Sequence, residues 1–261
     1  MRFAPAALLG ALALLAGCRD QPAPANEFDP ATIAAAGACR EQIFEGTRFT
    51  ICPFDTNRDR IELAWRGADG RPLRSLPALR DWLGPRAADV RFAMNAGMYD
   101  DKGAPIGLLV VDGARLKPLN LNTGPGNFHL LPNGVFAVDE AGRVSVTASR
   151  DFAARVPKPR WATQSGPMLV IDGALHPGLA DNGDSRYVRN GVGVRDARRG
   201  VFAISDEPVS FGRFARLFRD ALGCRDALYL DGSVSSIWDP GAGREQGHME
   251  LGPLIVVSRG K

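Results

Sequence analysis

The chain has 261 residues, of which 45% are hydrophobic and 23% charged, the ordinary composition of a globular protein. Its formal net charge of +3 is small and no run of five or more Lys or Arg residues occurs, so nothing supports nucleic-acid binding. With 30 Gly and 19 Pro the chain is rich in turns, which favours many short strands over a helical bundle.

The first residues have the pattern of an export signal. Met1-Arg2 gives a short basic start, residues 3–16 are apolar and rich in Ala and Leu, and Gly17-Cys18 closes the stretch. An apolar run of about 14 residues is shorter than the roughly 20 that a membrane-spanning helix needs, and it suits a signal peptide. Small residues directly before a cysteine resemble the bacterial lipobox, in which that cysteine is lipidated. The alternative is an ordinary secretory signal with an accidental cysteine.

These patterns divide the chain into three parts. We expect a lipoprotein signal peptide over residues 1–17, a Pro- and Ala-rich tether lipidated at Cys18 over residues 18–37, and one globular domain over residues 38–261. The protein would then be anchored in the bacterial cell envelope, facing the periplasm. Arg19 favours the outer membrane, because lipoproteins kept at the inner membrane often carry Asp directly after the lipid cysteine.

The remaining cysteines have separate expected roles. Cys39 and Cys52 flank a predicted hairpin with strands over residues 41–44 and 48–51, so we expect a disulfide in an oxidising periplasm. Cys224 is expected to be a buried small hydrophobe. The sequence has no Cys/His cluster with zinc spacing and requires no cofactor, although a divalent metal held by Asp231 and neighbouring oxygens stays open.

Short strands dominate the rest of the chain. Apolar segments on both sides of Asp112-Gly113 and Asp172-Gly173 predict two hairpins with two-residue turns. Helices are predicted over residues 76–83 and 211–222, the second with Ser210 as N-cap and Gly223 as its end. The other strands are expected over residues 61–65, 90–94, 135–138, 143–146, 187–194, 200–205, 227–230 and 254–257. Without regular βαβ alternation, this order predicts a single α+β domain with a mixed, largely antiparallel sheet and few helices.

The segment that starts at Asp231-Gly232 differs from the two hairpin turns. After Asp112-Gly113 and Asp172-Gly173 an apolar strand follows, whereas Ser-Val-Ser-Ser follows Gly232. A carboxylate at the end of a buried strand, followed by small hydroxyl residues, is typical of a binding site. An ordinary polar turn is the alternative.

Alternation in the predicted strand 187–194 indicates a second candidate surface. One face carries valines and Asn190 and is expected to be core. The other presents Arg189 beside Gly191 and Gly193, which we interpret as an open surface for an anionic ligand. The alternative is a solvated face with packing glycines.

Four ordered motifs resemble the phosphodiester glycosidase family over residues 61–257. They are Asn-Ala-Gly-Met-Tyr at 95–99, Gln-Ser-Gly-Pro at 164–167, Arg-Asn-Gly-Val-Gly at 189–193 and Leu-Tyr-Leu-Asp-Gly at 228–232. The family more often has Asp-Gly-Gly-Gly-Ser where this chain has Asp-Gly-Ser-Val-Ser, and Gly at the position of Ala96.

The resemblance implies hydrolysis of a sugar 1-phosphodiester, which the export signal would place in the cell envelope. We assign Arg189 to the phosphate and Asp231 to the carboxylate that faces the reacting carbon. Asp206 and Glu207 are the backup carboxylates, with charges at a helix entry as their alternative role. The other expected substrate-binding residues are Asn95, Gly97, Gln164, Ser165, Asn190, Gly232 and Ser235.

The expected partners are an anionic glycan or sugar-phosphate substrate and, through the lipid anchor, the membrane. Two other functions stay open. One is a non-catalytic envelope module that binds anionic glycans, and the other is a hydrolase acting on another linkage of an envelope polymer.

Overall fold

The computed structural model describes Met1 and residues 38–155, 158–246 and 249–260. Apart from Met1, the predicted signal peptide, Cys18 and the tether lie outside the described residues. The helices are α2 (Leu76–Leu83), α3 (Ser149–Arg155) and α4 (Phe211–Arg216), and a π-helical turn at Leu217–Ala221 continues α4. The strands are β1 (Arg40–Phe44), β2 (Thr47–Asp55), β3 (Asp59–Ala64), β4 (Val90–Asn95), β5 (Leu109–Val111), β6 (Ala114–Lys117), β7 (Gly134–Asp139), β8 (Val144–Ala148), β9 (Pro159–Ser165), β10 (Met168–Ile171), β11 (Ala174–Leu175), β12 (Asn190–Val194), β13 (Arg199–Ser205), β14 (Asp226–Tyr229), β15 (Ile237–Asp239), β16 (Arg244–Glu245) and β17 (Leu254–Arg259).

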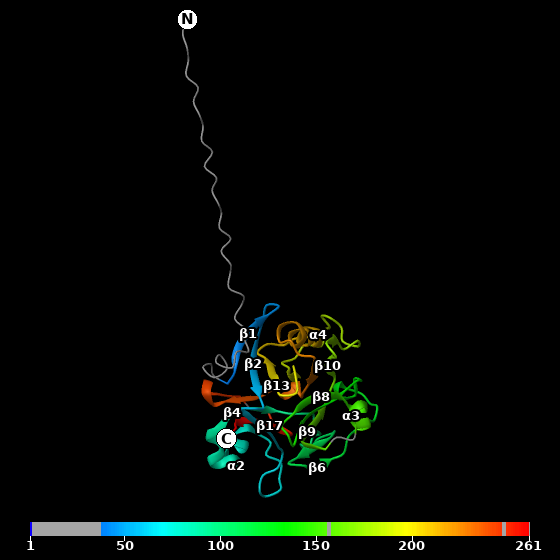
Figure 1. Cartoon of the computed structure of the whole chain (residues 1–261). Helices are drawn as coiled ribbons and strands as arrows, with labels where there is room; N and C mark the ends of the chain where they lie inside the picture. Colours follow the sequence, from blue (N-terminus) through cyan, green and yellow to red (C-terminus); the bar gives the residue numbers. More distant parts are fainter. Residues whose placement is uncertain (2–37, 156–157, 247–248, 261) are drawn as a thin grey trace.

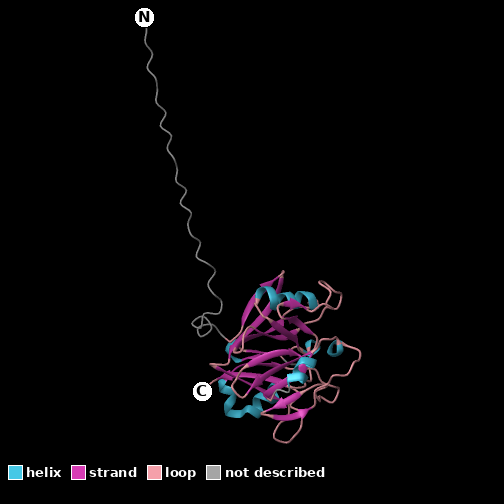
Figure 2. Cartoon of the chain, turned by 45° about the vertical axis from the view of Figure 1, so that its right-hand side comes forward, coloured by secondary structure: helices cyan, strands magenta, loops and turns pink. Residues whose placement is uncertain are grey.

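The strands form three antiparallel sheets. The seven-stranded sheet has the order β1-β2-β13-β12-β14-β10-β11; the β4 sheet has the order β16-β15-β4-β17-β3, and the β9 sheet the order β6-β5-β9-β7-β8. The short helices lie on the outside of the strands (Figure 1, Figure 2). The predicted α+β class with a single domain and a largely antiparallel arrangement is confirmed.

The main core lies where the three sheets face one another. The ring of Phe202 on β13 lies 5.3 Å from that of Phe54 on β2, 5.6 Å from that of Phe136 on β7 and 5.8 Å from that of Phe92 on β4, measured between centroids. One side chain of the seven-stranded sheet therefore contacts both other sheets. This shared core fixes the ends of β4, β12 and β14 relative to one another.

The two hairpin turns and the ends of the second helix, which short sequence patterns predicted, are present in the structure. Asp112 and Asp172 both adopt φ of 49°, as the predicted two-residue hairpin turns require. Ser210 Oγ accepts the backbone N–H of Arg213 at 3.2 Å and caps α4, and Gly223 with φ of 60° follows the end of the π-helical turn. None of the helices in the described part of the chain is both long and apolar enough to cross a membrane.

The predicted open glycine surface of β12 is wrong. A Cβ atom on Gly191 would lie 3.1 Å from a ring carbon of Phe214, and one on Gly193 would lie 2.7 Å from a ring carbon of Phe218. The two glycines therefore let α4 and its π-helical turn pack directly against the sheet. The opposite, valine-bearing face is core as predicted, with Val192 fully buried.

The three cysteines among the described residues are arranged as predicted. Cys39 and Cys52 form a disulfide that ties the residue before β1 to the middle of β2. Cys224 is free and buried, and burial raises the pKa of its thiol to about 12. It is therefore a packing residue.

Candidate active site

A buried network of two asparagines joins the ends of β4 and β12. The side-chain amide of Asn190 donates to both the backbone oxygen and Oδ1 of Asn95, each at 3.0 Å. Asn95 Nδ2 donates to the backbone oxygen of Asp231 at 2.6 Å, and Asn95 Oδ1 accepts the N–H of Ser236 at 2.9 Å. The predicted residues Asn95 and Asn190 thus hold the segment 231–236 at both ends.

Asp231 and Gly232 form no hairpin turn. Asp231 has φ of −88° and ψ of 95°, an ordinary extended conformation, and a 3-10 turn over Gly232–Val234 follows it. The charge of Asp231 contributes, after burial, to raising the pKa of Tyr99 to about 12. Asp231 therefore lies close to the Asn-Ala-Gly-Met-Tyr motif, which the chain reaches more than a hundred residues earlier.

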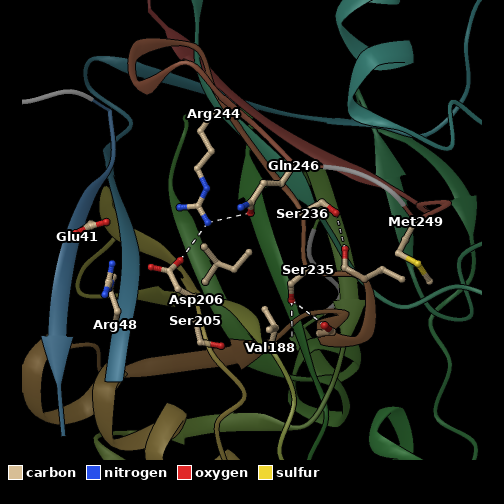
Figure 3. Close-up of a pocket in the computed structure, with 13 residues that line it drawn as sticks. Glu41, Arg48, Val188, Ser205, Asp206, Ser235, Ser236, Arg244, Gln246 and Met249 are labelled. Atoms are coloured by element: carbon tan, nitrogen blue, oxygen red, sulfur yellow. Dashed lines mark hydrogen bonds and ion pairs between the residues drawn. The ribbon is translucent and has the colours of Figure 1, made fainter. Parts of the chain in front are cut away.

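A cavity of about 740 Å³ opens beside this segment. Ser235 and Ser236 line one side of it, and Glu41 and Arg48 line the other, with Asp206 and Arg244 between them (Figure 3). The complete lining is Glu41, Arg48, Val188, Ile204, Ser205, Asp206, Gly232, Val234, Ser235, Ser236, Arg244, Gln246 and Met249. The cavity therefore combines residues of the seven-stranded sheet and of the β4 sheet.

Asp206 and Arg244 are hydrogen-bonded to each other in this cavity. Nη2 of Arg244 donates to Oδ1 of Asp206 at 3.1 Å and to Oε1 of Gln246 at 2.9 Å. Nη1 of Arg244 donates to Oγ1 of Thr50 at 2.5 Å, and Thr50 in turn donates to Asp206 at 3.1 Å. These bonds fix the plane of the guanidinium, so Arg244 presents its charge in one orientation.

Arg48 is the second guanidinium of the cavity and has different surroundings. It lies on β2 and is exposed. Within the described ranges its side chain makes no hydrogen bond and no ion pair, although its backbone oxygen accepts the N–H of Asp206 at 3.0 Å. Arg48 can therefore turn toward an anionic ligand without breaking an existing ion pair.

Arg189, which we expected to bind the phosphate, does not line this cavity. Its side chain is fully buried under α4, with the guanidinium carbon 3.5 Å from the centroid of the Phe211 ring. Nε donates to the backbone oxygen of Val209 and Nη2 to that of Ser185, both at 2.8 Å. Burial lowers the pKa of Arg189 from its usual value. The residue is part of the packing between the sheet and α4.

The Gln-Ser-Gly-Pro motif also lies in the interior, outside the cavity. The side chain of Gln164 accepts from the backbone of Leu108 and Asn120 and donates to Ser149. Ser165 is fully buried. Gly97 packs against the backbone of Gln164, so that a Cβ atom at position 97 would overlap the backbone oxygen of Gln164. The N–H of Gly97 donates to the hydroxyl of Thr163 at 3.2 Å. These residues connect β4 to the β9 sheet.

The predicted residues thus fall into three groups. Asp206, Gly232 and Ser235 line the cavity, and Asn95, Asn190 and Asp231 lie directly behind or beside its wall. Gly97, Gln164, Ser165 and Arg189 are internal, and Glu207 is exposed outside the cavity lining. No sequence motif pointed to Arg48, Arg244 and Gln246, which also line the cavity.

The described part of the chain contains no group of three or more His, Cys, Asp and Glu side chains placed to hold a metal ion. Asp206, one of the two carboxylates in the cavity lining, already accepts from Thr50 and Arg244. We therefore derive no step through a metal ion.

Comparison with known proteins identifies the family. The model of the phosphodiester glycosidase family matches residues 88–242. The uncharacterized protein YigE of Escherichia coli (strain K12) is 35% identical over 213 residues, which cover 81% of each chain. Among solved structures, the catalytic domain of zebrafish N-acetylglucosamine-1-phosphodiester alpha-N-acetylglucosaminidase, auto-inhibited by its pro-peptide, has a TM-score of 0.59 at 12% identity, covering 85% of this chain and 82% of that one. A hypothetical protein from Synechocystis has a TM-score of 0.52 at 15% identity, covering 85% of this chain and 61% of that one. The chain belongs to the phosphodiester glycosidase family, a family of hydrolases.

Proposed function

We propose that this protein hydrolyses a sugar 1-phosphodiester in the cavity beside the segment 231–236. Water would displace the phosphate at the anomeric carbon, giving a free sugar and a phosphate monoester. Family membership supports the substrate class. The observation that carries the proposal is that Gly232, Ser235 and Ser236, in the segment held by the two asparagines, line a cavity that also contains two guanidinium groups.

We assign recognition of the phosphate to Arg48 and Arg244 in place of Arg189. Arg244 has a fixed orientation, and Arg48 is free to approach the ligand. A phosphodiester carries one negative charge in the bound substrate, and the phosphate gains a second as the anomeric bond breaks. The two arginines therefore contribute to binding and also stabilise the departing phosphate.

We assign Asp231 to the carboxylate that faces the positive charge developing at the anomeric carbon. A phosphate monoester is a good leaving group, so the reaction needs less general-acid help than ordinary glycoside hydrolysis. Ser235 lines the cavity and its hydroxyl donates to the backbone oxygen of Gly232 at 2.9 Å, which leaves its oxygen available to accept from a sugar hydroxyl. Asp206 acts in this proposal by orienting Arg244.

We further propose that the protein works in the cell envelope, attached through Cys18, and that its natural substrate is an anionic glycan. The export pattern of the first 18 residues supports this location.

The test is incubation of the purified protein with a panel of methyl sugar 1-phosphodiesters in water enriched in oxygen-18. Cleavage at the anomeric carbon places the label in the released sugar, whereas attack at phosphorus places it in the phosphate. Label in the phosphate, or release of methanol, would contradict a glycosidase. Binding without any release of sugar would favour the non-catalytic module.

A further inference from the structure

Tyr229, at the end of β14, lies directly beneath Gly232. Its hydroxyl oxygen accepts the backbone N–H of Gly232 at 3.0 Å, and its side chain is 2% exposed. A Cβ atom on Gly232 would overlap this hydroxyl oxygen. The phenol hydroxyl therefore fixes the position of the Asp231-Gly232 peptide relative to β14, and only glycine fits at position 232 against this hydroxyl.

Arg189, which does not line the cavity, contacts the ring of Tyr229. Its guanidinium carbon lies 5.3 Å from the centroid of the Tyr229 ring, within the range of a cation–π contact. Val209 and Ser185 fix the guanidinium by hydrogen bonds to their backbone oxygens, and the ring of Phe211 covers it. The Phe211 and Tyr229 rings meet edge to face at 4.8 Å.

A buried guanidinium without a carboxylate partner is costly for stability. No salt bridge to Arg189 occurs among the residues that the structure describes. A Met or Leu side chain would fill the same space between the rings at a lower desolvation cost. Packing alone therefore does not explain why this position carries an arginine.

We propose that Arg189 and Tyr229 are positioning residues that fix the Asp231-Gly232 turn for catalysis without touching the substrate. The inference rests on the proposed function, because it assumes that Asp231 faces the reacting carbon. Tyr229 provides the acceptor under Gly232, and Arg189 fixes the ring that carries this acceptor. On the other side, Asn95 holds the backbone oxygen of Asp231.

The decisive variant is Tyr229→Phe, which removes only the hydroxyl. We expect kcat to fall about tenfold, with KM within about twofold of the parent, because one hydrogen bond to the turn is lost. Hydrogen exchange of the Gly232 amide should become faster. The matched control is Tyr187→Phe, since the Tyr187 ring also lies near Arg189, at 5.7 Å, but is 55% exposed. This control should change neither kcat nor the exchange of Gly232.

A double-mutant cycle with Arg189→Met tests whether the two residues act together. If Arg189 works through the phenol, the double variant should be no slower than Tyr229→Phe alone. The inference would be overturned if the effects of Arg189→Met and Tyr229→Phe on kcat multiplied in the double variant. It would also be overturned if Tyr229→Phe had the kcat and the Gly232 amide exchange of the parent. If Arg189→Met does not fold, the Tyr229→Phe and Tyr187→Phe pair still decides.

Failure of the proposed function has a different outcome. In that case the parent protein releases no sugar from any phosphodiester, whereas the exchange of the Gly232 amide still reports whether Tyr229 holds the turn.

Discussion

The side-chain amide of Asn190 donates to both oxygens of Asn95, and this contact joins the seven-stranded sheet to the β4 sheet. Both side chains are buried, so water cannot replace the bonds if one partner changes. Two motifs that are 95 residues apart in the chain thereby support the same wall of the cavity.

Asn190→Asp should damage both stability and turnover. The substitution replaces the donor with a carboxylate oxygen facing the two oxygens of Asn95, in a buried place. We expect a loss of about 3 kcal/mol in the free energy of unfolding, measured by urea titration, and a lower kcat at a temperature where the protein stays folded. Asn122→Asp, at an exposed position, is the control. A stability like that of the parent would show that the pair is dispensable.

Asp231→Asn should lower kcat by about a hundredfold or more while binding of a product sugar phosphate changes little. Asparagine keeps the shape of the side chain and removes the charge that would meet the developing positive carbon. Asp112→Asn, in the hairpin turn of the β9 sheet, provides the control. If Asp231→Asn hydrolyses the substrate as fast as the parent does, the carboxylate role passes to Asp206.

Arg48→Met should raise KM about tenfold or more, because the charge that Arg48 meets is already present in the bound substrate, and should also lower kcat, because this charge grows as the phosphate leaves. The salt dependence of KM should also weaken. Arg115→Met, on the exposed strand β6, is the matched control. An unchanged KM would remove Arg48 from the phosphate site.

The Cys39–Cys52 disulfide closes a short loop, with a sequence separation of 13 residues. Replacing both cysteines with Ser should lower the free energy of unfolding by about 3 kcal/mol according to the chain-entropy model. We expect the melting temperature to fall and the kcat of the folded fraction to stay near that of the parent. Identical unfolding curves with and without reductant would contradict this.

Lipidation of Cys18 can be tested in a bacterial host fed with labelled palmitate. The parent chain should carry label and sediment with membranes, and Cys18→Ala should do neither. Cys224→Ala, which removes a buried thiol, should keep the label. Labelled, membrane-bound Cys18→Ala would disprove the assignment.

Local sequence signals predicted local structure well. The turns at Asp112 and Asp172 need positive φ, the cap at Ser210 acts within one helical turn, and the disulfide spans a single hairpin. Each depends on residues that are close in sequence. The contrast between these turns and Asp231 also pointed correctly to a different conformation at Asp231.

The wrong prediction for β12 arose because alternation shows which residues share a face, but not what covers it. The rings of Phe214 and Phe218 on the predicted helix needed a surface to pack on, and Gly191 and Gly193 are that surface. Because the predicted helix covers this face of β12, Arg189 on the same face is buried as well.

Arg48 and Arg244 were missed for a different reason. They meet in one cavity only because the seven-stranded sheet and the β4 sheet come together around the shared core, with Arg244 on the two-residue strand β16. Arg244 bonds to Thr50, two residues after Arg48, across almost two hundred residues, and such a contact leaves no periodic trace in the sequence.

The two walls of the cavity differ in how much substitution they tolerate. One wall is the segment 231–236, which rests on Tyr229 and the buried asparagines and accepts almost no change at Gly232. The other wall carries the exposed side chains of Glu41 and Arg48, and Gln246 lies beside Arg244 between the two walls; a substitution can exchange these side chains without disturbing the core. Adaptation to a new group attached to the phosphate, in evolution or in the laboratory, should therefore proceed through the β1–β2 hairpin and the β16 side, while the chemistry of the anomeric carbon stays the same.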